Sequence, residues 1–150
     1  MIQKHFKEIV LKNFGFDFSP TQETAINLFA EFFFSQNETG LFLLKGYAGT
    51  GKTTLVAALV NTLLSLKYKV VLLAPTGRAA KVFSAYSGQP AFTIHKKIYR
   101  QKTATDGEGF FNLGFNQGTD TLFFVDEASM ISNFNSGENF GSGCLLDDLM

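Results

Sequence analysis

The chain has 150 residues, of which 45% are hydrophobic and 17% charged, and its 13 basic side chains balance 13 acidic ones. This length and apolar content suit one compact domain, and 18 phenylalanines exclude a disordered chain, because disordered chains are charge-rich and poor in aromatic residues. No apolar run approaches the ~18 residues of a membrane span, and none near the amino terminus predicts a signal peptide.

The first part of the chain predicts two helices. Apolar residues recur at helical spacing over residues 2–10, and Gly15 follows as a stop signal. Residues 19–22, Ser-Pro-Thr-Gln, then supply an N-cap, a proline at the first helical position and a capping-box glutamine. The apolar stripe behind them runs to Phe33.

Three short apolar runs predict strands, at Leu41–Lys45, Lys69–Ala74 and Thr121–Val125. A glycine-rich turn and an amphipathic helix follow the first strand, and a helix from about Arg78 to Ala85 follows the second. Continuously apolar strands that alternate with helices indicate an α/β fold with a parallel sheet covered by helices on both faces.

The rest of the chain departs from this alternation. Residues Thr93–Tyr99 predict another short helix, and Gln101–Thr119 a hairpin or loop whose apolar part is Phe110–Phe115. The last residues, Leu145–Met150, have the apolar side of a helix, but no cap or stop follows them. We therefore expect a sequence cut within an element, with a frayed natural end as the alternative.

The segment Gly46–Thr53 (GYAGTGKT) fits the phosphate-loop pattern G-x-x-x-x-G-K-[ST]. Its glycines let backbone N–H groups turn toward phosphate oxygens at the positive end of the following helix. Lys52 is expected to reach the β- and γ-phosphates of ATP, and the Thr53 hydroxyl to bind Mg²⁺. The residues expected at the nucleotide are Gly46, Ala48, Gly49, Thr50, Gly51, Lys52, Thr53 and Thr54.

Two adjacent acids, Asp126 and Glu127, end the third predicted strand. Asp126 can hold Mg²⁺ through water, and Glu127 is placed to activate the attacking water. Acids also end strands as simple caps, but an upstream phosphate loop favours hydrolysis over phosphoryl transfer.

The balanced net charge hides a strong segregation. Residues 67–102 carry eight basic side chains and no acid, whereas residues 103–150 carry eight acids and no base. The middle segment can therefore face a polyanion while the overall field cancels. Chance segregation around a solvated surface is the alternative.

Four segments together resemble the first motor domain of superfamily 1 helicases, closest to the RecD-like group that includes the exodeoxyribonuclease V alpha subunit. They are Gly46–Thr54 (GYAGTGKTT), Ala74–Ala80 (APTGRAA), Thr93–His95 (TIH) and Val125–Met130 (VDEASM), in the family's order within residues 15–134. The resemblance implies a RecA-like P-loop NTPase fold, incomplete at the carboxyl end, with residues 1–150 as a partial first motor domain and a short insert at about 101–119. It also implies an ATP-driven 5′→3′ DNA helicase of recombination and repair.

The resemblance assigns roles to residues outside the phosphate loop. Gln22 would read adenine, although its capping-box position offers a structural alternative. Thr76, Gly77 and Arg78 match the motif that grips the DNA backbone, the alternative being an ordinary turn with a surface arginine.

Thr93 and His95 match a second DNA-contacting motif, although a lone histidine in an amphipathic helix is more often structural. The partners implied are single-stranded DNA and the nuclease and helicase subunits of a recombination complex, without a membrane. The single cysteine, Cys144, fits a reducing cytoplasm.

Part of the family pattern is missing. The Gly-Asp-x-x-Gln-Leu-Pro segment and the second motor domain, which carries the arginines that complete the ATP site, do not occur in these 150 residues. We therefore expect an ATP-binding half-site that does not hydrolyse ATP alone. A stand-alone nucleotide-binding regulatory module without motor activity is the alternative function, and a related RNA helicase is a third.

Overall fold

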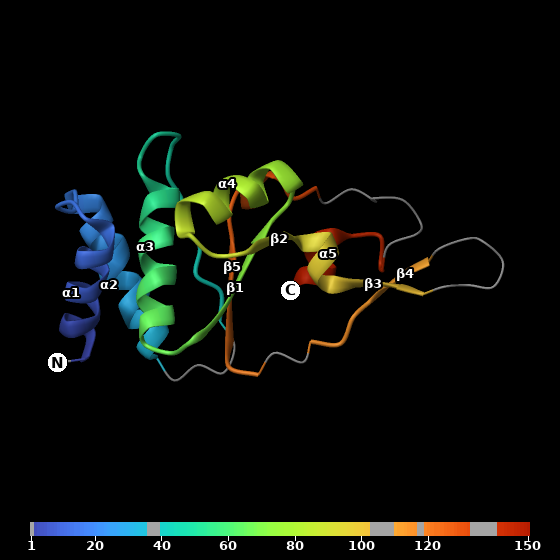
Figure 1. Ribbon diagram of the computed structural model, residues 1–150, viewed down its shortest axis with the longest axis horizontal. Coiled ribbons are helices and arrows are strands. Elements are labelled where there is room, and N and C mark those ends of the chain that lie inside the picture. The colour runs from blue at the N-terminus through green and yellow to red at the C-terminus, as the bar shows by residue number, and fades with distance from the viewer. Residues whose placement is uncertain (1, 36–39, 103–109, 117–118, 133–140) are drawn as a thin grey trace. The chain divides into compact units, whose positions relative to one another are not determined.

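The computed structural model describes residues 2–35, 40–102, 110–116, 119–132 and 141–150. The chain divides into two compact units, residues 1–68 and residues 69–150 (Figure 1). No helix in these described ranges is long and apolar enough to cross a membrane.

The first unit is built from three helices, α1 (Ile2–Phe14), α2 (Pro20–Phe34) and α3 (Lys52–Ser65). Helix α1 packs against both of the others, and its buried Phe6 and Val10 belong to the core. Both helices predicted before residue 35 are confirmed. Gly15, with a φ of 79°, follows α1, as the stop signal predicted.

Aromatic rings make up much of this first core. The Phe6 ring lies 6.2 Å from Phe29, 5.9 Å from Phe33 and 5.6 Å from Phe34, measured between centroids. These spacings are those of favourable ring pairs. The abundance of phenylalanine is thus explained in part by packing.

The strand predicted at Leu41–Lys45 is wrong, because these residues form no strand in the structure. Leu41 and Leu43 are 68% and 61% exposed, whereas Phe42 packs edge-on against Phe29 at 5.4 Å. A strand exists only where a neighbour completes its ladder of hydrogen bonds, and the described residues of the first unit contain no other strand. Phe42 instead packs against Phe29 and Phe32 of α2.

The second unit contains a parallel three-stranded sheet, as predicted. Its order is β2 (Ala91–Thr93), β1 (Lys69–Ala74) and β5 (Thr121–Val125), with Leu73 opposite Phe92 and Leu72 opposite Phe124. Two strands coincide with the predicted runs. Strand β2 was missed, since three residues after a proline are too few to show a period.

Two helices cover this sheet. Helix α4 (Gly77–Ser87) packs on β1 and β2, begins one residue before its predicted start and ends two residues after its predicted end. Its C-cap is Gly88, whose φ is 67°. Helix α5 (Ile94–Ile98) confirms the short helix, although Thr93 is its N-cap and Tyr99 already starts the next strand. The sheet and its helices confirm the α/β fold class.

The hairpin is also confirmed, since β3 (Tyr99–Lys102) pairs antiparallel with β4 (Phe110–Leu113). Residues 103–109 and 117–118 of the predicted insert lie outside the described residues. A 3₁₀ turn, η1 (Ala128–Met130), and helix α6 (Leu145–Leu149) complete the unit. Leu145 joins the core cluster of Leu73, Ile94 and Tyr99.

A hydrogen-bond cluster fixes α6 to the start of β3. The Tyr99 hydroxyl donates to Asp148 Oδ2 over 2.5 Å, and the N–H of Ser142 donates to the same oxygen over 3.0 Å. Burial, and then the Asp148 carboxylate, raise the pKa of Tyr99. Burial also opposes ionisation of Asp148, but the bonds from Tyr99 and Ser142 outweigh it and lower the pKa of Asp148.

Candidate functional site

The phosphate loop lies at the amino end of α3, which begins at Lys52. Gly49 and Gly51 have φ values of 78° and 79°, in the left-handed region that other residues rarely adopt. A Cβ at Gly46 would lie 3.0 Å from Thr50 Oγ1 and 3.3 Å from Lys52 Cδ. All three glycines therefore allow a tight backbone turn immediately before the N-terminus of α3. A turn of this kind at a helix N-terminus is the geometry that binds phosphate.

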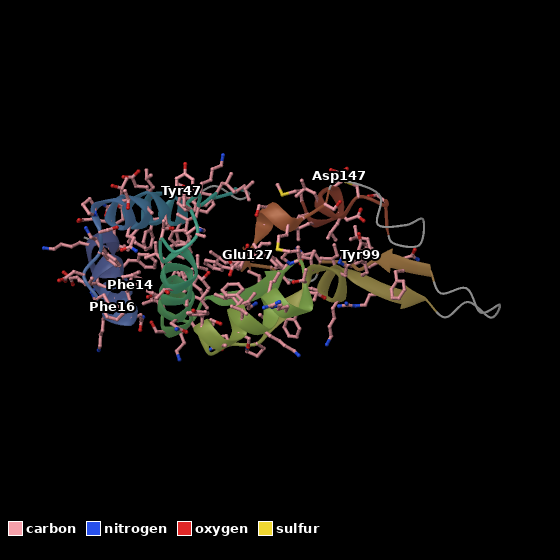
Figure 2. All side chains as sticks on the ribbon, turned by 90° about the horizontal axis from the view of Figure 1, so that it is seen from above. Phe14, Phe16, Tyr47, Tyr99, Glu127 and Asp147 are labelled. Carbon is pink, nitrogen blue, oxygen red and sulfur yellow. The ribbon has the colours of Figure 1, made fainter. Side chains whose placement is uncertain are left out.

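Hydrogen bonds within the loop hold its polar side chains. The carbonyl of Tyr47 accepts from Lys52 Nζ at 2.7 Å and from Thr50 Oγ1 at 2.8 Å. This carbonyl gives the Lys52 ammonium an oxygen acceptor of the kind that a phosphate would present. The Tyr47 ring itself is 89% exposed (Figure 2).

Gln22 caps α2 and also contacts the phosphate loop. Its Oε1 accepts from the N–H of Ser19 at 2.9 Å, and Ser19 Oγ accepts from the Gln22 N–H at 3.3 Å, so the capping box is confirmed. Its Nε2 also donates to the Thr50 carbonyl over 3.2 Å. The glutamine thus lies against the phosphate loop, and reading adenine would require it to exchange bonds that it makes here.

The remaining loop residues have different degrees of exposure. Ala48 and Thr50 are exposed, while Thr53 and Thr54 are half-buried in the first turn of α3. Thr53 is the oxygen donor that the pattern offers to Mg²⁺, and hydroxyl, carboxylate and phosphate oxygens are the ligands that this hard cation prefers. No cluster of three metal-ligating side chains occurs among the described residues, so phosphate or water oxygens would have to complete its coordination.

The acids of the second unit follow β5. The N–H of Asp126 donates to the Leu73 carbonyl at 3.0 Å, and Asp126 Oδ1 accepts from the N–H of Glu127 at 3.0 Å. Glu127 is exposed and has a φ of 53° (Figure 2). A left-handed backbone at a residue other than glycine costs on the order of 1 kcal/mol, and such residues gather at functional sites. The end of β5 therefore presents two carboxylates. That of Asp126 accepts a backbone hydrogen bond, and that of Glu127 is exposed.

The first motif predicted to contact DNA lies at the start of α4. Thr76 is the N-cap, and its Oγ1 accepts from the N–H of Ala79 at 3.1 Å. A Cβ at Gly77 would meet nothing within 4 Å, and Arg78 is exposed. Neither salt bridge found among the described residues involves Arg78. The turn offers a helix N-terminus beside an exposed guanidinium, which suits a backbone phosphate.

The residues of the second motif predicted to contact DNA are engaged in a helix cap and a ring contact. Thr93 caps α5, with its Oγ1 accepting from the N–H of Lys96 at 3.2 Å. The half-buried His95 ring packs 5.6 Å from the Tyr99 ring. These contacts favour the structural alternative for His95.

Sequence reasoning missed two residues beside this motif. Arg100 Nη1 donates to the carbonyls of Lys97 and Tyr99 at 3.2 and 3.3 Å, so its guanidinium ends α5. Phe92, one residue before the motif, lies beside two lysines. An aromatic residue flanked by basic ones within an acid-free segment is the signal that could have identified Phe92.

Comparison with known proteins finds a protein family that matches this chain and individual proteins that are similar to it. A family model described as an AAA domain matches residues 18–138. The ATP-dependent RecD2 DNA helicase of Deinococcus radiodurans is 33% identical over 93 residues, which cover 62% of this chain and 12% of the relative. The ATP-dependent DNA helicase dda of Enterobacteria phage T4 is 45% identical over 53 residues, 35% of this chain and 12% of the relative. No solved structure matches. The resemblance to RecD-like superfamily 1 helicases is thereby confirmed.

Proposed function

The chain belongs to the AAA domain family, and we propose that it is the ATP-binding part of an ATP-dependent DNA helicase motor, with residues 1–150 forming part of the first RecA-like domain. One observation carries the nucleotide side of this proposal: left-handed Gly49 and Gly51 lead into the helix that begins at Lys52. The chain matches only 12% of the length of each relative. Those relatives' names, and the residues below, support the wider activity.

The phosphate loop and Gln22 have distinct roles in this proposal. The loop N–H groups and Lys52 bind the triphosphate, and the Lys52 ammonium leaves the Tyr47 carbonyl for a phosphate oxygen. Gln22 exchanges its present bonds for those of adenine. Because the loop is already folded, little ordering remains to oppose binding.

The hydrolytic step would use the acids after β5. Thr53 and Asp126 would hold Mg²⁺, which when bound neutralises charge on the phosphates. Glu127 orients the attacking water and accepts its proton, which explains an exposed carboxylate fixed on a strained backbone.

The DNA side uses basic and helix-end groups of the second unit. Thr76, Gly77 and Arg78 bind one backbone phosphate. Thr93 and His95 contact the same strand of DNA, for which the His95 ring would have to leave its packing on Tyr99. Movement in the 5′→3′ direction, a place in recombination and repair with nuclease and helicase subunits, and a cytoplasmic location are the finer parts of the proposal. The resemblance to the exodeoxyribonuclease V alpha subunit supports the first two, and the single cysteine supports the last.

A regulatory nucleotide-binding module is the second candidate, because the geometry of the phosphate loop by itself supports nucleotide binding and not motor activity. Such a module would bind ATP without binding DNA.

A pair of titrations tests the proposal. With a fluorescent ATP analogue and Mg²⁺, Lys52→Ala should weaken binding by about 10- to 100-fold, the range for hydrogen bonds to charged groups. Lys45→Ala, an exposed lysine just before the loop, should bind as the wild type does. Equal affinity in wild type and Lys52→Ala contradicts the phosphate-loop assignment. ATP binding without affinity for a labelled single-stranded oligonucleotide would instead favour the regulatory module.

A further inference from the structure

A basic aromatic cluster, formed by Phe92, Lys96 and Lys97, lies at the edge of the parallel sheet. We propose that Phe92 stacks on a base of single-stranded DNA while Lys96 and Lys97 bind the phosphates on its two sides. This inference rests on the proposed function, and it adds a base contact where the motif residues contact only backbone.

The position of Phe92 is unusual for a phenylalanine in this sheet. It lies in β2, an edge strand, directly opposite Leu73. Partner residues of parallel strands point to the same face, yet Leu73 is fully buried and Phe92 is 37% exposed. An aromatic ring is therefore exposed to solvent at the edge of the sheet, where a smaller side chain could occupy the same position in the strand.

Two ammonium groups accompany this ring. Lys96 Nζ and Lys97 Nζ each lie 5.9 Å from its centroid, within the range of cation–π attraction. Residues 67–102 contain no acid, and neither salt bridge found in the described ranges uses these lysines. The cluster thus combines two positive charges with a π surface.

The local backbone keeps the cluster in place. The Thr93 cap starts α5 one residue after Phe92, and Arg100 holds the carbonyls at its other end. The lysines therefore project from a helix whose two ends are held, and their long side chains can turn from the ring toward phosphates. Little backbone ordering would oppose binding.

The chemistry selects single-stranded nucleic acid as the partner. A single strand presents an unstacked flat base with a phosphate on each side, which matches one ring between two cations. An acidic protein would satisfy the lysines and leave the ring without a π partner. Lysines also protect sheet edges from pairing with other chains, but that role does not require an exposed aromatic residue.

The test uses two labelled oligonucleotides of equal length and charge, one of thymidines and one of abasic sugars. By anisotropy, the wild-type chain should prefer the thymidine strand by about tenfold, within the range for one stacked base. Phe92→Leu should remove this preference without changing the salt dependence, and Phe92→Tyr should retain it. Phe16→Leu, at a position 73% exposed (Figure 2), should behave as wild type.

The lysines are tested by the salt dependence. The double variant Lys96→Gln, Lys97→Gln should lower the slope of log affinity against log salt by about 1.4, or about 0.7 for each phosphate of a single strand. The double variant Lys4→Gln, Lys12→Gln changes two exposed lysines of α1 and should leave the slope unchanged.

The outcomes separate this inference from the function on which it rests. DNA binding that depends on Arg78 but shows no preference for bases, or a preference that survives Phe92→Leu, overturns the stacking contact alone. Failure of the wild type to bind either oligonucleotide overturns the DNA function and this inference with it. Displacement of both oligonucleotides by polyglutamate at equal charge concentration would point to an acidic protein and also overturn it.

Discussion

The two units hold their candidate residues in different ways. In the first unit, Lys52, Thr50 and Gln22 all donate hydrogen bonds to carbonyls within the phosphate loop. In the second unit, Arg78 and Glu127 are exposed at the ends of regular elements. A nucleotide would therefore have to replace bonds that already exist, whereas Arg78 and Glu127, the groups proposed to bind DNA and to activate water, are already exposed to solvent.

This difference decides what each variant can show. Loop variants remove both a ligand contact and a local bond, so nucleotide affinity and stability must be measured together. Variants at exposed side chains disturb the fold little, because surface substitutions usually change stability by less than about 0.5 kcal/mol. Binding and rate are then the informative measurements in the second unit.

The largest expected effect concerns turnover. We expect the 150-residue chain to show no DNA-stimulated ATP hydrolysis, because an arginine at the γ-phosphate is worth roughly 10³–10⁵ in rate. Arg100 is occupied by carbonyls, and Arg78 lies in the DNA motif. Phosphate release under multiple-turnover conditions is the measurement, with Glu127→Gln as the control. Turnover that Glu127→Gln abolishes would show that this chain already holds a complete site.

Gln22→Glu separates the two roles of that residue. A glutamate can still accept the Ser19 N–H, so the capping box should be retained. It cannot donate to Thr50 or to adenine as the amide does, so affinity for an ATP analogue should fall by about tenfold. Gln22→Ala should instead lower both affinity and melting temperature. Unchanged affinity in both variants would leave Gln22 with its capping role alone.

Sequence reasoning succeeded best where a short segment determines the backbone by itself. Motifs whose chemistry lies in the backbone were predictable, since Gly49 and Gly51 adopt the left-handed turn that the pattern requires. The strand at Leu41–Lys45 was not, because pairing depends on a partner that a local apolar run does not reveal. The ring contacts of Phe92 and the carbonyl bonds of Arg100 are local in sequence, but they depend on how α5 joins β2 and β3, and β2 was not predicted.

Arg78→Ala should have a moderate effect on DNA binding. If the guanidinium holds one phosphate, its loss should lower the slope of log affinity against log salt by about 0.7. Thr76 should still cap α4, so the fold should not change. Anisotropy with a single-stranded oligonucleotide at several salt concentrations measures the slope. The same slope in wild type and Arg78→Ala would return this arginine to the ordinary surface.

The smallest expected effect is the pH dependence of the contact between Tyr99 and Asp148. Because folding lowers the pKa of Asp148, its carboxylate stabilises the fold above the ordinary value of about 4, and this contribution is lost as the pH falls through the lowered pKa. Because folding raises the pKa of Tyr99, its hydroxyl contributes below about pH 10, and that contribution is lost as the pH rises through the raised pKa.

Asp148→Asn should therefore reduce stability at pH 7 by no more than about 1 kcal/mol and flatten the acidic limb of a plot of melting temperature against pH. Asp147→Asn is a matched control, because Asp147 is exposed on the same helix and its neighbour makes the bonds to Tyr99 and Ser142. Tyr99→Phe keeps the buried ring but removes the hydrogen bond, so it should also lower stability. In the plot of melting temperature against pH it should flatten only the alkaline limb, to which the Tyr99 hydroxyl contributes. An acidic limb that is equally steep in wild type and Asp148→Asn would mean that other carboxylates govern acid unfolding, and that α6 is held by Leu145 rather than by this hydrogen bond.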